Sequence, residues 1–107
     1  MPGGEEAQAR TFYVGLLGMT ELEKPSELAP RGGVWFRSGD IFLHLRVDPD
    51  FRPAARAHPA LRCVDYRALV EKLGVSGIST VSDGRLVEGR PHCCVYDPFG
   101  NRIELIG

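Results

Sequence analysis

The chain has 107 residues, of which 43% are hydrophobic and 25% are charged, and its formal net charge is −1. This length and composition fit one globular domain and exclude a fibrous or largely disordered protein. The small net charge excludes a general attraction to nucleic acid or anionic membranes, and no apolar run reaches membrane-spanning length. The N-terminus does not resemble a signal peptide, and the three cysteines are an odd number, so we expect a cytoplasmic protein with reduced thiols.

The first half of the chain is predicted to contain one helix followed by three strands. Apolar residues recur at helical spacing in residues 5–17, and Gly18 is placed to end that helix. Residues 19–24 suit a strand. Residues 33–38 and 40–47 are rich in strand-forming residues and are joined by a short polar turn, which predicts a hairpin.

The second half is predicted to have the same order of elements, with one more strand in front. Asp65 is expected to cap a helix at residues 66–73, which Gly74 would end. Val64 and Leu69 would pack together across the start of this helix as a hydrophobic staple. The other predicted elements, in chain order, are strands at residues 58–64, 77–83, 91–97 and 101–106, with a polar turn at residues 84–90.

The two halves therefore form an internal repeat. Each helix ends in the dipeptide Leu-Gly, and each half closes with a hairpin whose second strand carries one ionisable residue among aliphatic ones. That residue is His44 in the first half and Glu104 in the second. A repeat of about half the chain suits a two-fold pseudo-symmetric domain. The strand that opens the second half has no counterpart before the first helix, so we expect that strand to be absent from this chain.

Glu104 raises a chemical question, because it lies between the aliphatic residues Ile103 and Leu105. A carboxylate on a buried strand is costly unless it has a partner. A metal ion, an arginine or water could satisfy it, and the residues alone leave these three possibilities open.

The sequence FYVGLLGM at residues 12–19 and DPFGNRIEL at residues 97–105, together with the repeat, resemble the vicinal oxygen chelate superfamily. This superfamily includes glyoxalase I, bleomycin-resistance proteins, fosfomycin-resistance enzymes and extradiol dioxygenases. The resemblance covers nearly the whole chain. It implies one α+β domain of residues 1–107 made of paired βαβββ modules, at residues 1–50 and 57–107, with the first strand of module one absent. The resemblance also implies that the mixed sheet curls into a cleft that holds a divalent metal.

The resemblance further implies that the metal ligands lie on the first and last strands of the modules. The matching residues of this chain are His44, His58 and Glu104. Two imidazoles and a carboxylate suit Zn, Ni, Fe, Mn or Co and leave open positions for substrate oxygens. A lone histidine on a strand is more often structural than a ligand, and Glu104 could instead pair with an arginine. Glu104 is also the only match for a catalytic base.

Strand alternation places an arginine on the predicted face of each candidate ligand. Guanidinium groups bind carboxylate and phosphate well, which favours a pocket for an anionic or oxygen-rich molecule. The alternative is that the arginines are solvated at strand ends and that the aromatic residues belong to the core. His92 and the adjacent cysteines receive no role, since neighbours on a strand point to opposite faces. The predicted substrate-binding residues are Arg46, Arg62, Arg102, Trp35 and Phe42.

Two functions are consistent with this interpretation. The first is a glyoxalase-like metalloenzyme, a lyase, isomerase or dioxygenase, in which the metal acts as a Lewis acid on a small oxygen-rich or anionic substrate. The alternative is a metal-free protein that sequesters a ligand, as bleomycin-resistance proteins do, and the absent strand favours it slightly because one ligand position is lost. A third possibility is that Met1 is an internal methionine of a longer reading frame.

We also expect a homodimer, because an absent strand leaves an unpaired sheet edge that invites pairing with another chain. The other expected partner is a small-molecule substrate or ligand, with no nucleic acid and no membrane.

Overall fold

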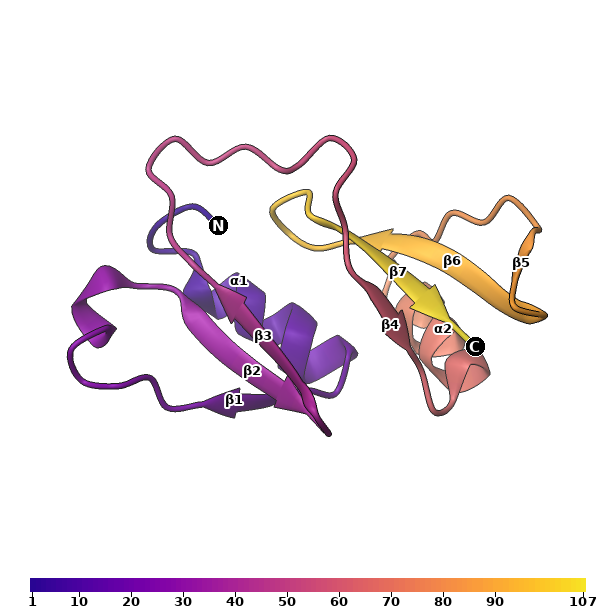
Figure 1. The fold of residues 1–107 in the computed structure, drawn as a ribbon, viewed down its shortest axis with the longest axis horizontal. Coiled ribbons are helices and arrows are strands. Elements are labelled where there is room, and N and C mark those ends of the chain that lie inside the picture. Colours follow the sequence, from indigo (N-terminus) through magenta and orange to yellow (C-terminus); the bar gives the residue numbers. More distant parts are fainter. The chain divides into compact units, whose positions relative to one another are not determined.

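The computed structural model describes residues 1–107 and divides the chain into two compact units, Met1–Arg52 and Pro53–Gly107. In each unit a helix packs against one face of a β-sheet (Figure 1). The prediction of an α+β fold built from repeated modules is confirmed. None of the helices is both long enough and apolar enough to cross a membrane.

The first unit has one continuous helical segment and a three-stranded antiparallel sheet in the order β1-β2-β3. The helical segment ends at Gly18, whose φ of 73° suits a glycine, as the sequence predicted. Its elements are α1 (Glu6–Arg10), the π-helix η1 (Thr11–Leu16), β1 (Thr20–Leu22), the 3-10 helix η2 (Ala29–Arg31), β2 (Val34–Ser38) and β3 (Ile41–Leu45).

The core of the first unit lies between η1 and β2. Val34 and Phe36 are buried, and they alternate along β2 with residues of the other face. The ring of Tyr13 stacks on that of Phe36 with centroids 5.1 Å apart. The helical segment of α1 and η1 thus covers the Phe36 face of the sheet and leaves the opposite face, which carries Trp35, uncovered by these two helices (Figure 1).

Gly33 allows β2 and β3 to approach each other at the start of their pairing. Its φ is 81°, and a Cβ atom there would lie 2.2 Å from the carbonyl oxygen of Leu45. Its N–H donates a hydrogen bond to Glu6 Oε1 at 2.9 Å. Only glycine fits this position, and its contact with Glu6 ties the helix to the sheet.

The second unit has one α-helix and a four-stranded sheet in the order β4-β7-β6-β5. Strand β4 is parallel to β7, and the other pairs are antiparallel. Asp65 caps the helix as predicted, because its Oδ1 accepts a hydrogen bond from Ala68 N at 3.2 Å. The elements are β4 (Ala60–Arg62), α2 (Tyr66–Val75), β5 (Leu86–Val87), β6 (Arg90–Tyr96) and β7 (Arg102–Ile106).

The core of the second unit lies on one face of β6 and β7. Along β7 the side chains alternate between this buried face and a more open one, whereas on β6 Cys94 of the other face is buried as well. The turn between these strands is held by the buried Asp97, whose Oδ1 accepts hydrogen bonds from Phe99 N and Asn101 N. This turn sets the register that places Glu104 opposite Cys94. The buried side chains of this core include Leu73 from α2 and Cys93, Val95, Ile103 and Leu105 from the sheet.

Two predictions about α2 are wrong. Val64 is fully exposed and cannot form the predicted hydrophobic staple with Leu69. Gly74 does not end the helix, which continues to Val75 and is followed by Gly77 with a φ of 79°. Gly74 keeps a helical conformation. The helix ends instead before Gly77, which takes the left-handed conformation three residues later.

The predictions for residues 77–83 and 84–90 are also wrong. Only Val81 of the predicted strand pairs, in an isolated bridge with Cys94. The predicted polar turn instead contains β5, which forms a two-residue hairpin with the start of β6. Short apolar stretches near glycines give weak strand signals, and the β6 edge decides which of them pairs.

Candidate functional site

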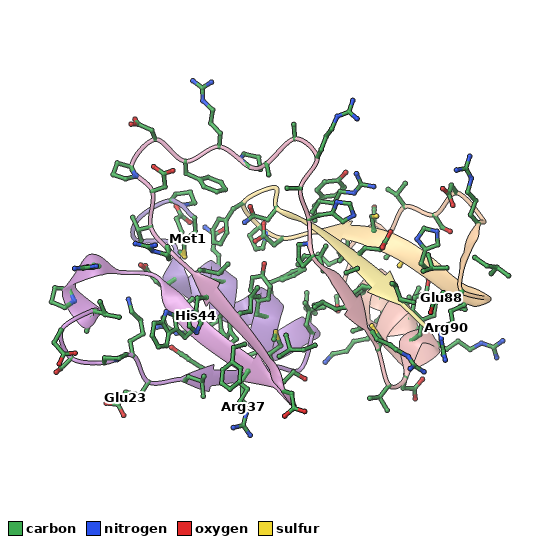
Figure 2. All side chains as sticks on the ribbon, in the orientation of Figure 1. Met1, Glu23, Arg37, His44, Glu88 and Arg90 are labelled. Carbon is green, nitrogen blue, oxygen red and sulfur yellow. The ribbon has the colours of Figure 1, made fainter.

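The open face of the first unit carries His44 on its outer strand, β3. His44 on β3 is the register partner of Trp35 on β2, and their rings are parallel within 4° with centroids 3.8 Å apart. The imidazole is exposed (Figure 2). Stacking fixes the plane of the ring, and neither ring nitrogen makes a hydrogen bond, so both stay available to a ligand.

Two hollows lie beside this ring pair, with volumes of about 320 Å³ and about 550 Å³. Both are lined by Lys24, Trp35 and His44, so they lie next to each other at the stacked rings. The cationic hollow is the smaller one, lined also by Leu28, Arg31, Gly32, Leu45, Arg46 and Val47. The apolar hollow is the larger one, lined also by Leu22, Glu23, Pro25 and Phe42.

The open face of the second unit carries Glu104 at its centre. Glu104 on β7 is flanked by its register partners Ala60 on β4 and Cys94 on β6. Its side chain is 19% exposed, and its Oε1 lies 3.2 Å from Nδ1 of His92. Since the carboxylate can only accept, the histidine nitrogen donates, and this bond engages one carboxylate oxygen while leaving Oε2 free.

His92 lies between two carboxylates. Its Nε2 is buried and 3.3 Å from Asp83 Oδ1, but without the alignment of a hydrogen bond. The backbone N–H of Arg85, and secondarily the charge of His92, lower the pKa of Asp83. Ser82 Oγ donates to the carbonyl oxygen of His92 at 3.0 Å, which holds this loop against β6. His92 is thus a fixed neighbour of Glu104.

His58 lies two residues before β4 and is exposed. Its Nδ1 is 2.7 Å from the carbonyl oxygen of Arg56. Because a carbonyl only accepts hydrogen bonds, Nδ1 carries the proton, and in the neutral ring Nε2 has a free lone pair. The hydrogen bond from Glu104 N to Pro59 O, at 2.9 Å, ties this segment to the strand of Glu104.

Each of these three side chains is of a type that can bind a divalent metal ion. Each of His44, His58 and Glu104 has one neighbour that fixes its orientation and at least one coordinating atom that accepts no hydrogen bond. A histidine whose Nδ1 donates to a backbone carbonyl is the arrangement that typically presents Nε2 to a metal.

The fold and sequence are similar to those of solved proteins. A crystal structure from Bacillus anthracis, described as a glyoxalase family protein, superposes with a TM-score of 0.92 and is 41% identical, covering 99% of this chain and 86% of that one. The chain belongs to the glyoxalase family.

Solved proteins of lower sequence identity share the fold of this chain. A glyoxalase/dioxygenase from Nostoc punctiforme has a TM-score of 0.78 at 24% identity and covers 99% of this chain and 85% of that one. The fosfomycin resistance protein FosX from Listeria monocytogenes has a TM-score of 0.78 at 12% identity. This match covers 99% of the present chain and 84% of the FosX chain. Both likenesses lie below 25% identity, and they show that the fold is shared. No family model matches the sequence, and comparison with curated proteins gives no match.

In this glyoxalase family member the residues predicted for the site are divided between the two units. Within neither unit do three His, Cys, Asp or Glu side chains form a metal-binding group, so the ligand set stays a prediction. His44 and the predicted substrate contacts Trp35, Phe42 and Arg46 belong to the first unit, and His58, Glu104, Arg62 and Arg102 to the second.

The predicted substrate residues have different surroundings. Phe42 is 60% exposed and is therefore not a core aromatic. Arg46 lines the cationic hollow, and Arg62 is exposed on β4. Arg102 Nε lies 3.4 Å from Cys94 Sγ, a contact that raises the pKa of this guanidinium, so Arg102 is partly engaged within its own sheet.

Sequence reasoning missed His92, Lys24 and Arg31. A signal for His92 was present, because alternation along β6 places it with Cys94 on the face of Glu104. Lys24 and Arg31 lie outside the predicted hairpin, and nothing in their spacing indicates that the segment after β1 lines a hollow.

Proposed function

We propose that this chain is a glyoxalase-like metalloenzyme that acts on a small, oxygen-rich anionic substrate. His44, His58 and Glu104 would hold one divalent ion of Zn, Ni, Fe, Mn or Co. The observation that supports this proposal is that each donor is oriented by a neighbour and keeps a free coordinating atom. Family membership adds to it, since the three residues match the ligand positions that the sequence resemblance implies.

A divalent ion held there would supply Lewis acidity toward substrate oxygens. Glu104 would act as the base and take a proton from the substrate carbon next to a carbonyl. Its Oε2, which accepts no hydrogen bond, is the atom that would take this proton. His92 would keep the carboxylate in one orientation, and Arg46, Arg62 and Arg102 would bind the anionic group of the substrate.

We further propose that the protein is a cytoplasmic homodimer. Strand β3 is the last strand of its sheet, and Ile41 on it is 39% exposed. Such an edge can pair with another chain. The three cysteines are free, which suits a reducing compartment. Light scattering at micromolar concentration should give a dimer that Ile41→Lys weakens, and a monomeric wild type would contradict this.

The metal proposal is tested by the metal content of protein purified without chelator and reloaded with each candidate ion. We expect near-stoichiometric binding in the wild type and its loss in His44→Ala, His58→Ala and Glu104→Ala. Glu27→Ala, which removes an exposed carboxylate elsewhere, should bind metal normally. If the wild type binds none of these ions, the protein is instead a metal-free ligand-sequestering protein of the bleomycin-resistance type.

A mixing experiment shows whether one chain or two copies supply the ligands. His44→Ala and Glu104→Ala each lack one ligand, and a mixed dimer of the two has both residues intact on different copies. Recovery of part of the metal on mixing would assign the ligands to two copies. No recovery, with exchange of subunits shown separately, would assign them to one chain.

A further inference from the structure

The cationic hollow of the first unit has an unbalanced positive charge. Lys24, Arg31 and Arg46 line it, and no Asp or Glu does. None of these three side chains forms an ion pair; Lys24 donates to the carbonyl oxygen of Gly32, which leaves its charge uncompensated. Three cations around one hollow without a carboxylate are complementary to an anion.

The apolar hollow has the opposite character. Leu22, Pro25 and Phe42 line it, and Phe42 exposes 60% of its surface. An exposed apolar patch that includes a large aromatic side chain is typical of a binding surface. The stacked rings of Trp35 and His44 line both this hollow and the cationic one.

Glu23 makes the two hollows differ further in charge. It is the only acidic residue among those that line the two hollows, and it lines the apolar one. Figure 2 shows its side chain directed away from His44. An anionic group is therefore disfavoured at the apolar end and favoured at the cationic end, so a ligand with one charge has one preferred orientation.

We propose that this surface binds a small aromatic carboxylate, with its ring on Trp35 and Phe42 and its carboxylate among Lys24, Arg31 and Arg46. The volumes of about 320 Å³ and about 550 Å³ fall in the range of small-molecule sites. Binding needs only residues of the first unit and no metal. As a statement about the substrate, however, it rests on the proposed function, because His44 lines both hollows.

The chain contains a single tryptophan, Trp35, so its fluorescence reports directly on this surface. The full-length protein is titrated in the presence of a chelator with phenylacetate, with its neutral analogue phenylacetamide, and with acetate, which lacks the ring. We expect saturable quenching by phenylacetate, with binding at least about fivefold weaker for the amide and for acetate. Equal binding of the amide, or no saturable quenching by phenylacetate, would overturn the proposal.

Two arginine variants separate a specific contact from general charge. Arg46→Gln removes a guanidinium from the cationic hollow and should weaken phenylacetate binding about fivefold. Arg37→Gln removes one from the same face of β2 that lines neither hollow, and should leave binding unchanged. If both substitutions weaken phenylacetate binding equally, the loss reflects net charge alone, and the assignment of Arg46 to the binding surface is wrong. Because chelator is present, failure here leaves the metal proposal standing, and failure of metal loading leaves this one standing.

Discussion

The two units share one repeat, but they hold their candidate ligands in different ways. His44 and Glu104 occupy equivalent places, each on the last strand of its unit and on the open face. His44 is exposed and contacts the ring of Trp35, whereas Glu104 is 19% exposed and accepts a hydrogen bond from His92. The first unit thus orients its ligand by stacking and leaves it open to solvent, and the second orients it by a polar contact in a partly buried site.

The sheets differ as well. In the second unit β4 pairs in parallel with β7, while in the first unit β3 is the last strand of a three-stranded sheet. Beyond the end of β3, Met1 N donates to Arg46 O at 2.8 Å and Asp48 N donates to Met1 O at 3.0 Å, the hydrogen-bond pattern of a parallel pair. The first unit has fewer strands to hold it, so its contacts between helix, sheet and turn should matter more to its stability.

Among the substitutions that test this comparison, Gly33→Ala in the first unit is expected to have the largest effect on the free energy of unfolding. The new Cβ atom would lie 2.2 Å from a backbone oxygen at a φ of 81°, and neither can be relieved by moving a side chain. We expect a loss of at least about 3 kcal/mol in the free energy of unfolding, measured by urea titration followed by circular dichroism.

Gly74→Ala in α2 of the second unit is the matched control. No atom lies within 4 Å of the added methyl group, and φ is not positive there. Because alanine favours a helix over glycine, this change should be neutral or stabilising by about 0.5–1 kcal/mol. If both substitutions destabilise the protein equally, the close approach of β2 and β3 does not govern the stability of the first unit.

The next largest effect is on metal affinity, and it tests how the candidate metal ligands His44 and Glu104 are oriented. Removing the hydrogen bond to Glu104 with His92→Leu should lower metal affinity about tenfold to hundredfold, because the carboxylate loses its fixed orientation. Removing the stack under His44 with Trp35→Leu should lower it less, about threefold, since stacking fixes only the ring plane. Isothermal titration with one divalent ion measures both.

His92→Gln keeps an N–H donor and should restore part of the affinity that His92→Leu loses. Arg85→Gln removes an exposed partner of Asp83, 3.8 Å away, without touching His92, and should have no effect. Unchanged affinity in His92→Leu, in a protein where Glu104→Ala abolishes binding, would show that His92 has only a structural role.

Much of the fold could be predicted because its determinants are local. The alternation along β2, β3, β6 and β7, the cap at Asp65 and the helix stop at Gly18 all depend on residues close in sequence. The predictions for residues 77–90 failed because the β6 edge selects its partners by tertiary contact. Propensity alone cannot show whether a short apolar stretch finds an edge to pair with.

The candidate site was less predictable, because its contacts cross between strands. The residue types at positions 44, 58 and 104 were indicated by the family resemblance, but the role of His92 follows from the β6–β7 register, which places it diagonally across from Glu104. The cationic hollow also depends on Lys24 and Arg31, which the segment between β1 and β2, including η2, brings to the same place as Arg46.

The smallest expected effect on stability concerns the hydrogen bond from Gly33 N to Glu6 Oε1, which joins the helix to the sheet in the first unit. The N–H of Gly33 lowers the pKa of Glu6 below its ordinary value of 4.5, so the charged form stabilises the folded state. That contribution is present above pH 4.5 and is lost as the pH falls through the lowered pKa. Glu6→Gln should therefore cost about 1 kcal/mol near about pH 7 and less as the pH falls toward about pH 3. Urea titrations at both pH values measure this difference, with Glu27→Gln as an exposed control that should show none. A cost for Glu6→Gln that is the same at both pH values would mean that the carboxylate charge does not tie the helix to the sheet.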